Sequence, residues 1–244
     1  MSTIRRHKTL YPAEVIDIVN VTPRMRRITV ADNNAPPPGD GLPAQWMKLF
    51  FPAHGDQQPT GRAYTIRRFD PDSGRITFDF VLHGDEGPAS RWAGRARVGD
   101  VLQVGGPRGG HLIDTQAAQY VLVGDATALP AIAAILEAMP SHIRATALIE
   151  VADMAEAAYL ADRPNLDVTW LYAGTFVPGA TGLIERAIRD AVIDTKTCQV
   201  WIAGESAMMK EVRAHLLLDR GVIHPAIDAA GYWKLGSADH RERD

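Results

Sequence analysis

The sequence predicts two domains: a six-stranded antiparallel β-barrel, followed by an α/β domain with a doubly wound parallel sheet. The chain has 244 residues, which is more than one domain usually contains. Up to about residue 110, short strands alternate with turns; after Thr115, buried strands alternate with helices. We therefore expect the first domain to span residues 1–115 and the second to span residues 116–244.

The barrel is predicted from short strands that are separated by turn residues. Asp72-Ser73-Gly74 is typical of a tight turn, so the strands on either side of it should form a hairpin. A helix that begins near Pro88 interrupts the strand pattern, because proline suits the first turn of a helix. Gly105–Gly110 is expected to be the closing loop of the barrel. The six expected strands are Glu14–Thr22, Arg26–Ala31, Gln45–Phe51, Gly61–Phe69, Arg75–Leu82 and Asp100–Gly105.

The second domain is predicted from strands that alternate with helices. Gln119–Val123 is a continuous apolar run, as in a parallel strand that is buried on both faces, and Thr127 should cap the next helix. Ligands of doubly wound sheets bind beyond the carboxyl ends of the strands, which here carry Gly124-Asp125 and Gly204-Glu205. Gly231–Lys234 is expected to be a tail that packs on this domain. The other expected strands are Arg144–Val151, Leu166–Tyr172 and Cys198–Ala203, the last ending in Gly204-Glu205-Ser206. The expected helices are Ala128–Met139, Met154–Leu160, Gly182–Val192 and one that follows Ser206 and runs to about Arg220.

Arg62-Ala63-Tyr64-Thr65 carries the clearest chemical pattern in the chain. In a strand, Arg62 and Tyr64 share one face and Thr65 lies on the other. A guanidinium binds phosphate oxygens in a bidentate manner and a tyrosine ring stacks, so the pair suits a ligand with a pyrophosphate and a planar ring. The helix start at Gly87 offers N–H groups that attract phosphate. The alternatives are an ordinary exposed strand and a plain connecting helix.

Composition excludes several classes of protein. The net charge of −3 and the lack of a strong run of Lys or Arg argue against a nucleic-acid partner. Cys198 is the only cysteine, so an intramolecular disulfide is excluded, and the eight histidines are dispersed without metal-ligand spacing. No segment approaches the roughly 20 apolar residues of a membrane span, and Met1–Leu10 lacks a signal-peptide core, so we expect a cytoplasmic protein. The sequence is compatible with a monomer.

A barrel with Arg-x-Tyr-Thr followed by a doubly wound domain resembles the ferredoxin-reductase-like flavoenzymes. Within that superfamily the chain is most similar to the siderophore-interacting proteins, which are FAD-dependent ferric-siderophore reductases. The similarity follows family order over nearly the whole chain. The matching stretches are Met47–Pro52, Arg62–Arg67, His83-Gly84, Gly87–Ala93, Gly99-Asp100, Gly106–Gly109, Gly124–Ile132, Val200–Glu205 and Gly231–Trp233.

The resemblance implies two groups of cofactor-binding residues. The barrel group would bind the flavin and its pyrophosphate, and consists of Arg62, Ala63, Tyr64, Thr65, His83, Gly87, Pro88, Ala89 and Ser90. His83 would take either a substrate or proton role or a structural hydrogen bond. The group in the second domain would contact the cofactor, face the nicotinamide and close over the flavin ring, and consists of Asp125, Thr127, Ala128, Gly204, Glu205, Tyr232 and Trp233.

The resemblance also implies a reaction. NADPH or NADH would deliver a hydride to FAD, and the reduced flavin would pass single electrons to the Fe(III) of a siderophore. Ferric siderophores are often anionic, so Lys48 and Lys234 are expected to attract the substrate. Two alternatives are a general flavin reductase that serves a protein electron acceptor, and a siderophore carrier without turnover.

The chain departs from the family pattern at two positions. An arginine often follows the Trp-Leu pair of the third α/β strand, but here Trp170-Leu171 is followed by Tyr172. Position 126 is alanine where glutamate is usual. Since an arginine usually receives the 2′-phosphate, the choice between NADH and NADPH stays open, with Arg163 and Arg186 as candidate cations.

Overall fold

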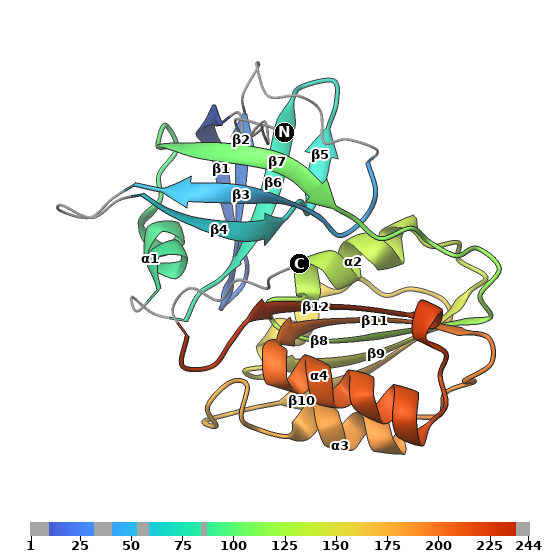
Figure 1. The fold of residues 1–244 in the computed structure, drawn as a ribbon. Helices are drawn as coiled ribbons and strands as arrows, with labels where there is room; N and C mark the ends of the chain where they lie inside the picture. The colour runs from blue at the N-terminus through green and yellow to red at the C-terminus, as the bar shows by residue number, and fades with distance from the viewer. Residues whose placement is uncertain (1–9, 32–40, 53–58, 84–86, 238–244) are drawn as a thin grey trace, which may run out of the picture. The chain divides into compact units, whose positions relative to one another are not determined.

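A computed structural model describes residues 10–31, 41–52, 59–83 and 87–237. The chain divides into two compact units, Met1–Asn20 with Arg24–Leu112 and Val21–Pro23 with Ile113–Asp244. The boundary that we expect at residue 115 stays a prediction. The fold class is confirmed, because an antiparallel barrel-like sheet is followed by a parallel sheet with helices (Figure 1). No helix among the described residues is long and apolar enough to cross a membrane.

The first sheet has seven strands in the order β4-β3-β7-β1-β2-β6-β5. Every strand pair with a recorded register in this sheet is antiparallel. The helix that interrupts the strands is α1 (Pro88–Arg95). The strands are β1 (Tyr11–Thr22), β2 (Met25–Ala31), β3 (Gln45–Phe51), β4 (Thr60–Thr65), β5 (Arg68–Asp70), β6 (Arg75–Val81) and β7 (Val101–Gly109).

The expected strand Gly61–Phe69 is in fact two strands, so the prediction of six strands is wrong by one. The Ile66 N–H still donates to Gln45 of β3, at 2.7 Å, whereas the Arg67 N–H donates to Thr77 of β6, at 2.9 Å. The chain therefore passes from one sheet edge to the other between these two residues. The alternation of side chains is interrupted at the crossing, where the consecutive residues Thr65 and Ile66 are both buried. The hairpin around Asp72-Ser73-Gly74 is confirmed, with β5 and β6 as its strands.

The expectation of a closing loop at Gly105–Gly110 is also wrong, since β7 continues to Gly109. The pairing of β3 with β7 shifts register between Trp46 and Lys48, and Gly106 has a φ of +144°, which disfavours other residues. The glycines therefore allow an irregular pairing of β3 with β7, in which a β-bulge shifts the register and the strands remain paired on both sides of it.

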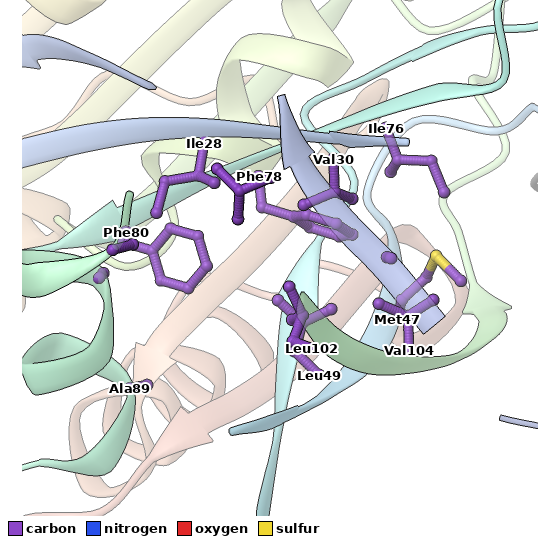
Figure 2. Packing of buried hydrophobic residues seen from close by; sticks show 14 of the residues in the cluster. Ile28, Val30, Met47, Leu49, Ile76, Phe78, Phe80, Ala89, Leu102 and Val104 are labelled. Atoms are coloured by element: carbon purple, nitrogen blue, oxygen red, sulfur yellow. The ribbon is translucent and has the colours of Figure 1, made fainter. Parts of the chain in front are cut away.

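The barrel core forms from residues that alternate along the strands. Met47 and Leu49 of β3 meet Ile28 of β2 and Phe78 of β6 in one apolar cluster (Figure 2). Ala89 and Ala93 of α1 join the same cluster. The core thus fixes β3, and β3 in turn positions its partner β4.

The second sheet has five strands in the order β10-β9-β8-β11-β12, and all of its recorded pairs are parallel. The segment interpreted as a polar tail packs on the domain as strand β12, which pairs with β11. Its short, glycine-interrupted sequence gave little strand signal. The strands are β8 (Gln119–Asp125), β9 (Arg144–Val151), β10 (Leu166–Tyr172), β11 (Cys198–Glu205) and β12 (Ile227–Trp233).

The helices cover both faces of this sheet. Ile184 of α3 and Met208 of α4 pack with Val121 and Val123, and Figure 1 shows these two helices side by side. A Cβ on Gly124, whose direction alternates with that of Val123, would meet Ile132 of α2, so α2 covers the other face. The helical elements are α2 (Leu129–Ala138), the short 3₁₀ helix η1 (Met154–Tyr159), α3 (Leu183–Asp190), α4 (Ser206–Ala214), a π-helical turn η2 (His215–Asp219) and the 3₁₀ turn η3 (His224–Ala226).

Candidate functional site

Strand β4 presents the Arg-x-Tyr-Thr residues on two faces. Arg62 lies opposite Leu49 of β3 and Tyr64 lies opposite Met47, so both share the face of the buried β3 residues. Thr65 lies opposite Trp46 on the other face. Arg62 and Tyr64 are half-buried, and the Arg62 Nη1 donates to the Gly61 carbonyl at 3.1 Å.

An aromatic cluster links Tyr64 to helix α1. The Tyr64 ring lies 4.4 Å from that of Phe80, at an interplanar angle of 36°, and meets Phe51 edge-on at 6.1 Å. Trp92 of α1 completes the cluster, 5.3 Å from Phe51 and 5.7 Å from Phe80. Burial raises the pKa of the Tyr64 hydroxyl far above its usual range, although Arg62 opposes the shift. Tyr64 therefore acts as a neutral aromatic surface whose position is tied to α1.

The start of α1 lies next to His83. Gly87, which has no side chain to act as a cap, precedes the helix in an extended conformation, and Pro88 occupies its first turn. Ser90 Oγ instead accepts from the His83 backbone N–H at 3.1 Å, and a Cβ on Gly87 would lie 3.2 Å from His83 Cε1. The exposed His83 and the α1 N-terminus are thus neighbours, as the resemblance implies, while Ala89 is buried.

Asp125 at the end of β8 organises the second group of residues. Its Oδ1 accepts from the Thr127 N–H at 2.8 Å and the Thr127 hydroxyl at 2.5 Å. Its Oδ2 accepts from the Glu205 N–H at 2.9 Å and the Trp233 indole N–H at 2.7 Å. Four donors occupy about four lone-pair positions, so the carboxylate has little capacity for another ligand. The expected cap by Thr127 is wrong, because Thr127 donates to Asp125 and the α2 N-cap is Ala128.

Glu205 at the end of β11 is buried, with 2% of its surface exposed. Its Oε2 accepts from the N–H groups of Ala207 and Met208, at 2.5 and 3.0 Å, and so caps α4. Its Oε1 accepts from the Leu235 N–H at 3.1 Å. Gly204 has a φ of +138°, and a Cβ there would lie 2.5 Å from Asp125 Oδ2. Gly204 is therefore required for the close approach of the two strand ends.

Trp233 is held from two sides. Its Nε1 donates to Asp125, and a Cβ on Gly179 would lie 2.8 Å from Trp233 Cη2. Ser206 Oγ also donates to the Trp233 carbonyl, at 2.9 Å. Tyr232 meets the buried ring of Trp201 edge-on at 6.4 Å. Lys234, which follows, is exposed.

A second buried carboxylate at this edge was missed from the sequence. Glu150 of β9 lies opposite Asp125 in the sheet, and its Oε2 accepts from the Thr181 hydroxyl at 2.5 Å. Burial raises the pKa of both carboxyls, and repulsion from Asp125 adds to the shift at Glu150. A glutamate inside an apolar strand was the available signal. No local sequence pattern indicated that the loop with Gly179 and Thr181 would contact Trp233 and Glu150.

The basic candidates fall in different places. Lys48 lies opposite Ala63 in the barrel sheet, on the face away from Arg62 and Tyr64. Arg163 donates to the carbonyls of Leu136, Met139 and Pro140 at the end of α2, so its guanidinium serves the fold. Arg186 stays a candidate for binding a nucleotide phosphate, because its side chain is exposed. Its Nη2 donates to the Thr181 carbonyl at 3.5 Å. Among the described residues there is no cluster of His, Cys, Asp and Glu that could hold a metal ion.

Two family models match the chain. Residues 117–236 match the model described as siderophore-interacting protein, and residues 53–111 match the siderophore-interacting FAD-binding domain. The ferric vibriobactin reductase ViuB of Vibrio cholerae is 30% identical over 201 residues, which cover 80% of this chain and 72% of ViuB. A siderophore utilization protein from T. fusca has a TM-score of 0.84 at 33% identity, with 96% of this chain and 95% of that one covered.

Another relative that matches nearly the whole chain is itself much longer. The mycobactin import ATP-binding/permease protein IrtA of Mycobacterium tuberculosis is 29% identical over 235 residues, which cover 93% of this chain. The chain spans 26% of the length of that relative.

The residues of the barrel fit FAD. Arg62 supplies a cation, the start of α1 supplies backbone N–H groups, and Gly87 leaves room where a side chain would crowd His83. Tyr64 supplies an aromatic surface within the same unit. This donor set suits a pyrophosphate joined to a planar ring.

Proposed function

Because the chain belongs to the siderophore-interacting protein family, we propose that it is a ferric-siderophore reductase that uses FAD and takes its electrons from NADPH or NADH. The match of residues 53–111 to the FAD-binding domain, on the strand that carries Arg62 and Tyr64, is the observation that carries this proposal. The similarity to a ferric vibriobactin reductase supports the substrate class.

In this proposal the barrel residues bind and orient the cofactor. Arg62 and the first N–H groups of α1 bind the pyrophosphate, while Tyr64 and Thr65 contact the flavin ring. The aromatic contacts of Tyr64 with Phe80 hold its ring in position. FAD, when bound, accepts a hydride from a nicotinamide and gives up electrons one at a time, which matches a two-electron donor to a one-electron acceptor.

The residues of the second domain hold the nucleotide. Since the Asp125 and Glu205 carboxylates are engaged within the protein, they position the strand ends, and contacts to the nucleotide fall to the backbone and to Thr127. Trp233 and Tyr232 supply aromatic surfaces. Lys48 and Lys234 increase the encounter rate with anionic ferric siderophores, which is sensitive to salt. Iron is the substrate and is released as Fe(II). We further propose a cytoplasmic monomer without a nucleic-acid partner.

The test is anaerobic turnover of the purified protein loaded with FAD. NADPH or NADH and a ferric siderophore are mixed with it, and Fe(II) is trapped by a ferrous chelator; we expect two Fe(II) for each nucleotide that is oxidised. Arg62→Ala should weaken FAD binding by about 10- to 100-fold, because a charge-assisted hydrogen bond contributes roughly 1.5–3 kcal/mol. Arg68→Ala, at an exposed arginine on β5, is the matched control and should bind FAD as the parent does.

Two results would contradict the proposal. If the loaded protein oxidises NADPH or NADH but leaves every ferric siderophore unreduced, it is a flavin reductase for another electron acceptor. If Arg62→Ala and Arg68→Ala retain FAD equally, the assignment of the pyrophosphate site is wrong.

A further inference from the structure

The outer face of β3 carries a surface on the side of the sheet away from Arg62 and Tyr64. Met47, Leu49 and Phe51 point into the core, and Figure 2 shows Met47 and Leu49 there. The residues between them, Trp46, Lys48 and Phe50, point the other way and are half-buried. Together with Arg108 of β7, which lies opposite Trp46, we call these four residues the β3 outer face.

Glycines on the neighbouring strands allow these side chains to lie flat on the sheet. A Cβ on Gly61 of β4 would overlap Lys48 Cε and would lie 2.8 Å from Phe50 Cε1. On the other side, a Cβ on Gly109 of β7 would lie 2.8 Å from Trp46 Nε1. The sheet therefore supports both aromatic rings from beneath, and their remaining exposed surface faces away from the core.

Each ring has a cation beside it. Arg108 Cζ lies 5.4 Å from the centroid of the Trp46 ring, and Lys48 Nζ lies 5.5 Å from that of Phe50. These distances are within the range of cation–π contacts. Trp46 and Lys48 are two residues apart on one strand, so their Cα atoms are about 7 Å apart. The β3 outer face is thus a flat surface with two aromatic rings and two positive charges.

This combination recognises one class of ferric chelate. A catecholate or phenolate siderophore presents aromatic rings with negative oxygens around the metal, and its tris-catecholate complex is strongly anionic. A tris-hydroxamate complex with Fe(III) is neutral and its ligands are aliphatic, so it gains little from stacking or from charge.

We propose that the β3 outer face docks aryl-type ferric siderophores, and that Trp46 and Arg108 select them over hydroxamates. This inference rests on the proposed reductase function. Trp46 lies opposite Thr65 and Lys48 lies opposite Ala63, so the face adjoins Thr65, which we assign to the flavin ring. Neighbouring strands are about 4.8 Å apart, so a chelate on this face is close to the strand that holds the redox group.

Binding can be measured without turnover by using gallium, which does not undergo reduction. The probes are the Ga(III) complexes of 2,3-dihydroxybenzoate and of acetohydroxamate, titrated into flavin-free protein. Arg108→Gln and Trp46→Leu should each weaken the aryl complex by about 3- to 10-fold, in line with the loss of a partly desolvated cation–π contact. Binding of the hydroxamate complex should change less than about 2-fold, and Arg68→Gln should change neither.

The outcomes separate this inference from the proposed function. Equal binding of both probes by the parent, or aryl binding that Arg108→Gln leaves unchanged, would overturn the inference while ferric reduction persists. If Trp46→Leu loses FAD instead of the aryl complex, Trp46 belongs to the cofactor site and the docking assignment is wrong. Failure of the loaded parent to reduce any ferric siderophore would refute the function, while the gallium titrations would still decide whether the face binds aryl chelates. Arg108→Gln changes a surface residue, so it keeps the test valid if Trp46→Leu does not fold.

Discussion

The hydrogen bond from Trp233 to Asp125 joins the ends of β12 and β8, and its removal should destabilise the second domain. The indole N–H donates to Asp125 Oδ2 at 2.7 Å, and the same carboxyl group accepts three further hydrogen bonds, two from Thr127 and one from the Glu205 N–H. Trp233→Phe keeps an aromatic ring but removes this donor. A hydrogen bond to a charged group contributes roughly 1.5–3 kcal/mol, and the smaller ring adds a packing loss, so we expect a total cost of about 2–4 kcal/mol.

A double-mutant cycle isolates the hydrogen bond from the packing loss. Asp125→Ala is made in the parent and in the Trp233→Phe variant, and the free energy of unfolding is measured with urea by far-UV circular dichroism at pH 8. The coupling energy should be about 1.5–3 kcal/mol, because the two groups are in direct contact. Trp201→Phe is the matched control: Trp201 is four residues before Glu205 on β11, about 13 Å along the strand, and should couple to Asp125 by less than about 0.5 kcal/mol. A coupling of Trp233 with Asp125 below about 0.5 kcal/mol would refute the claim that this bond holds the aromatic side chain.

Four further outcomes are expected. Gly204→Ala should cost at least about 2 kcal/mol of unfolding free energy, because its Cβ would meet Asp125 Oδ2 at 2.5 Å; Gly221→Ala, with a φ of +70° but open space, should cost about 1 kcal/mol, and equal costs would contradict the steric argument. Because the pKa values of Asp125 and Glu150 are raised on folding, the folded state binds protons more tightly, so unfolding free energy should rise as pH falls from neutral toward about 4, and Glu150→Gln should flatten that rise; a slope unchanged by Glu150→Gln would show that other groups cause it. Arg163→Ala, which removes donors to the carbonyls at the end of α2, should lower the free energy of unfolding by about 1.5–3 kcal/mol, whereas Arg186→Ala, at an exposed arginine, should change it little. If the reductase proposal holds, Arg186→Ala should raise the KM for NADPH by about 3- to 10-fold and leave that for NADH unchanged; equal effects on both would exclude a 2′-phosphate contact.

Local patterns were sufficient for most of the fold. The bounds of β9 and β10 coincide with the predicted Arg144–Val151 and Leu166–Tyr172; β9 is a central, largely buried strand, whereas β10 is an edge strand in which exposed residues alternate with half-buried ones. The errors lie where pairing changes without a change in the local sequence. The backbone N–H groups of Ile66 and Arg67 donate to β3 and β6, near opposite edges of the barrel sheet. Gly105–Gly109 continue strand β7 through a bulge. Such features depend on partners distant in sequence, so composition within a short window cannot identify them.

The sequence named residues for the candidate site but did not indicate which contacts their side chains make. That Asp125, Glu205 and Trp233 each meet a cofactor stays a prediction; the structure adds that they bind one another or nearby backbone groups. The sequence distance from Asp125 to Trp233 is large, and the partner that makes room for the ring, Gly179, lies in a loop with no motif. A single sequence therefore indicated the edge of the sheet but not which side chains are already engaged there.

The engaged carboxylates also explain how an acidic sheet edge can serve a nucleotide. Asp125, Glu150 and Glu205 all lie near the carboxyl ends of parallel strands, where free negative charges would repel a pyrophosphate. Each accepts hydrogen bonds from N–H or O–H groups of the protein, which spread its charge and turn its oxygens inward. The first turn of α2 lies next to this edge, but Pro130 has no N–H there, and the N–H groups of Ala131 and Ile132 both donate to the Ala128 carbonyl. The carboxylates thus fix the strand ends and the aromatic ring, and they do not stand at this edge as free charges that would repel a nucleotide.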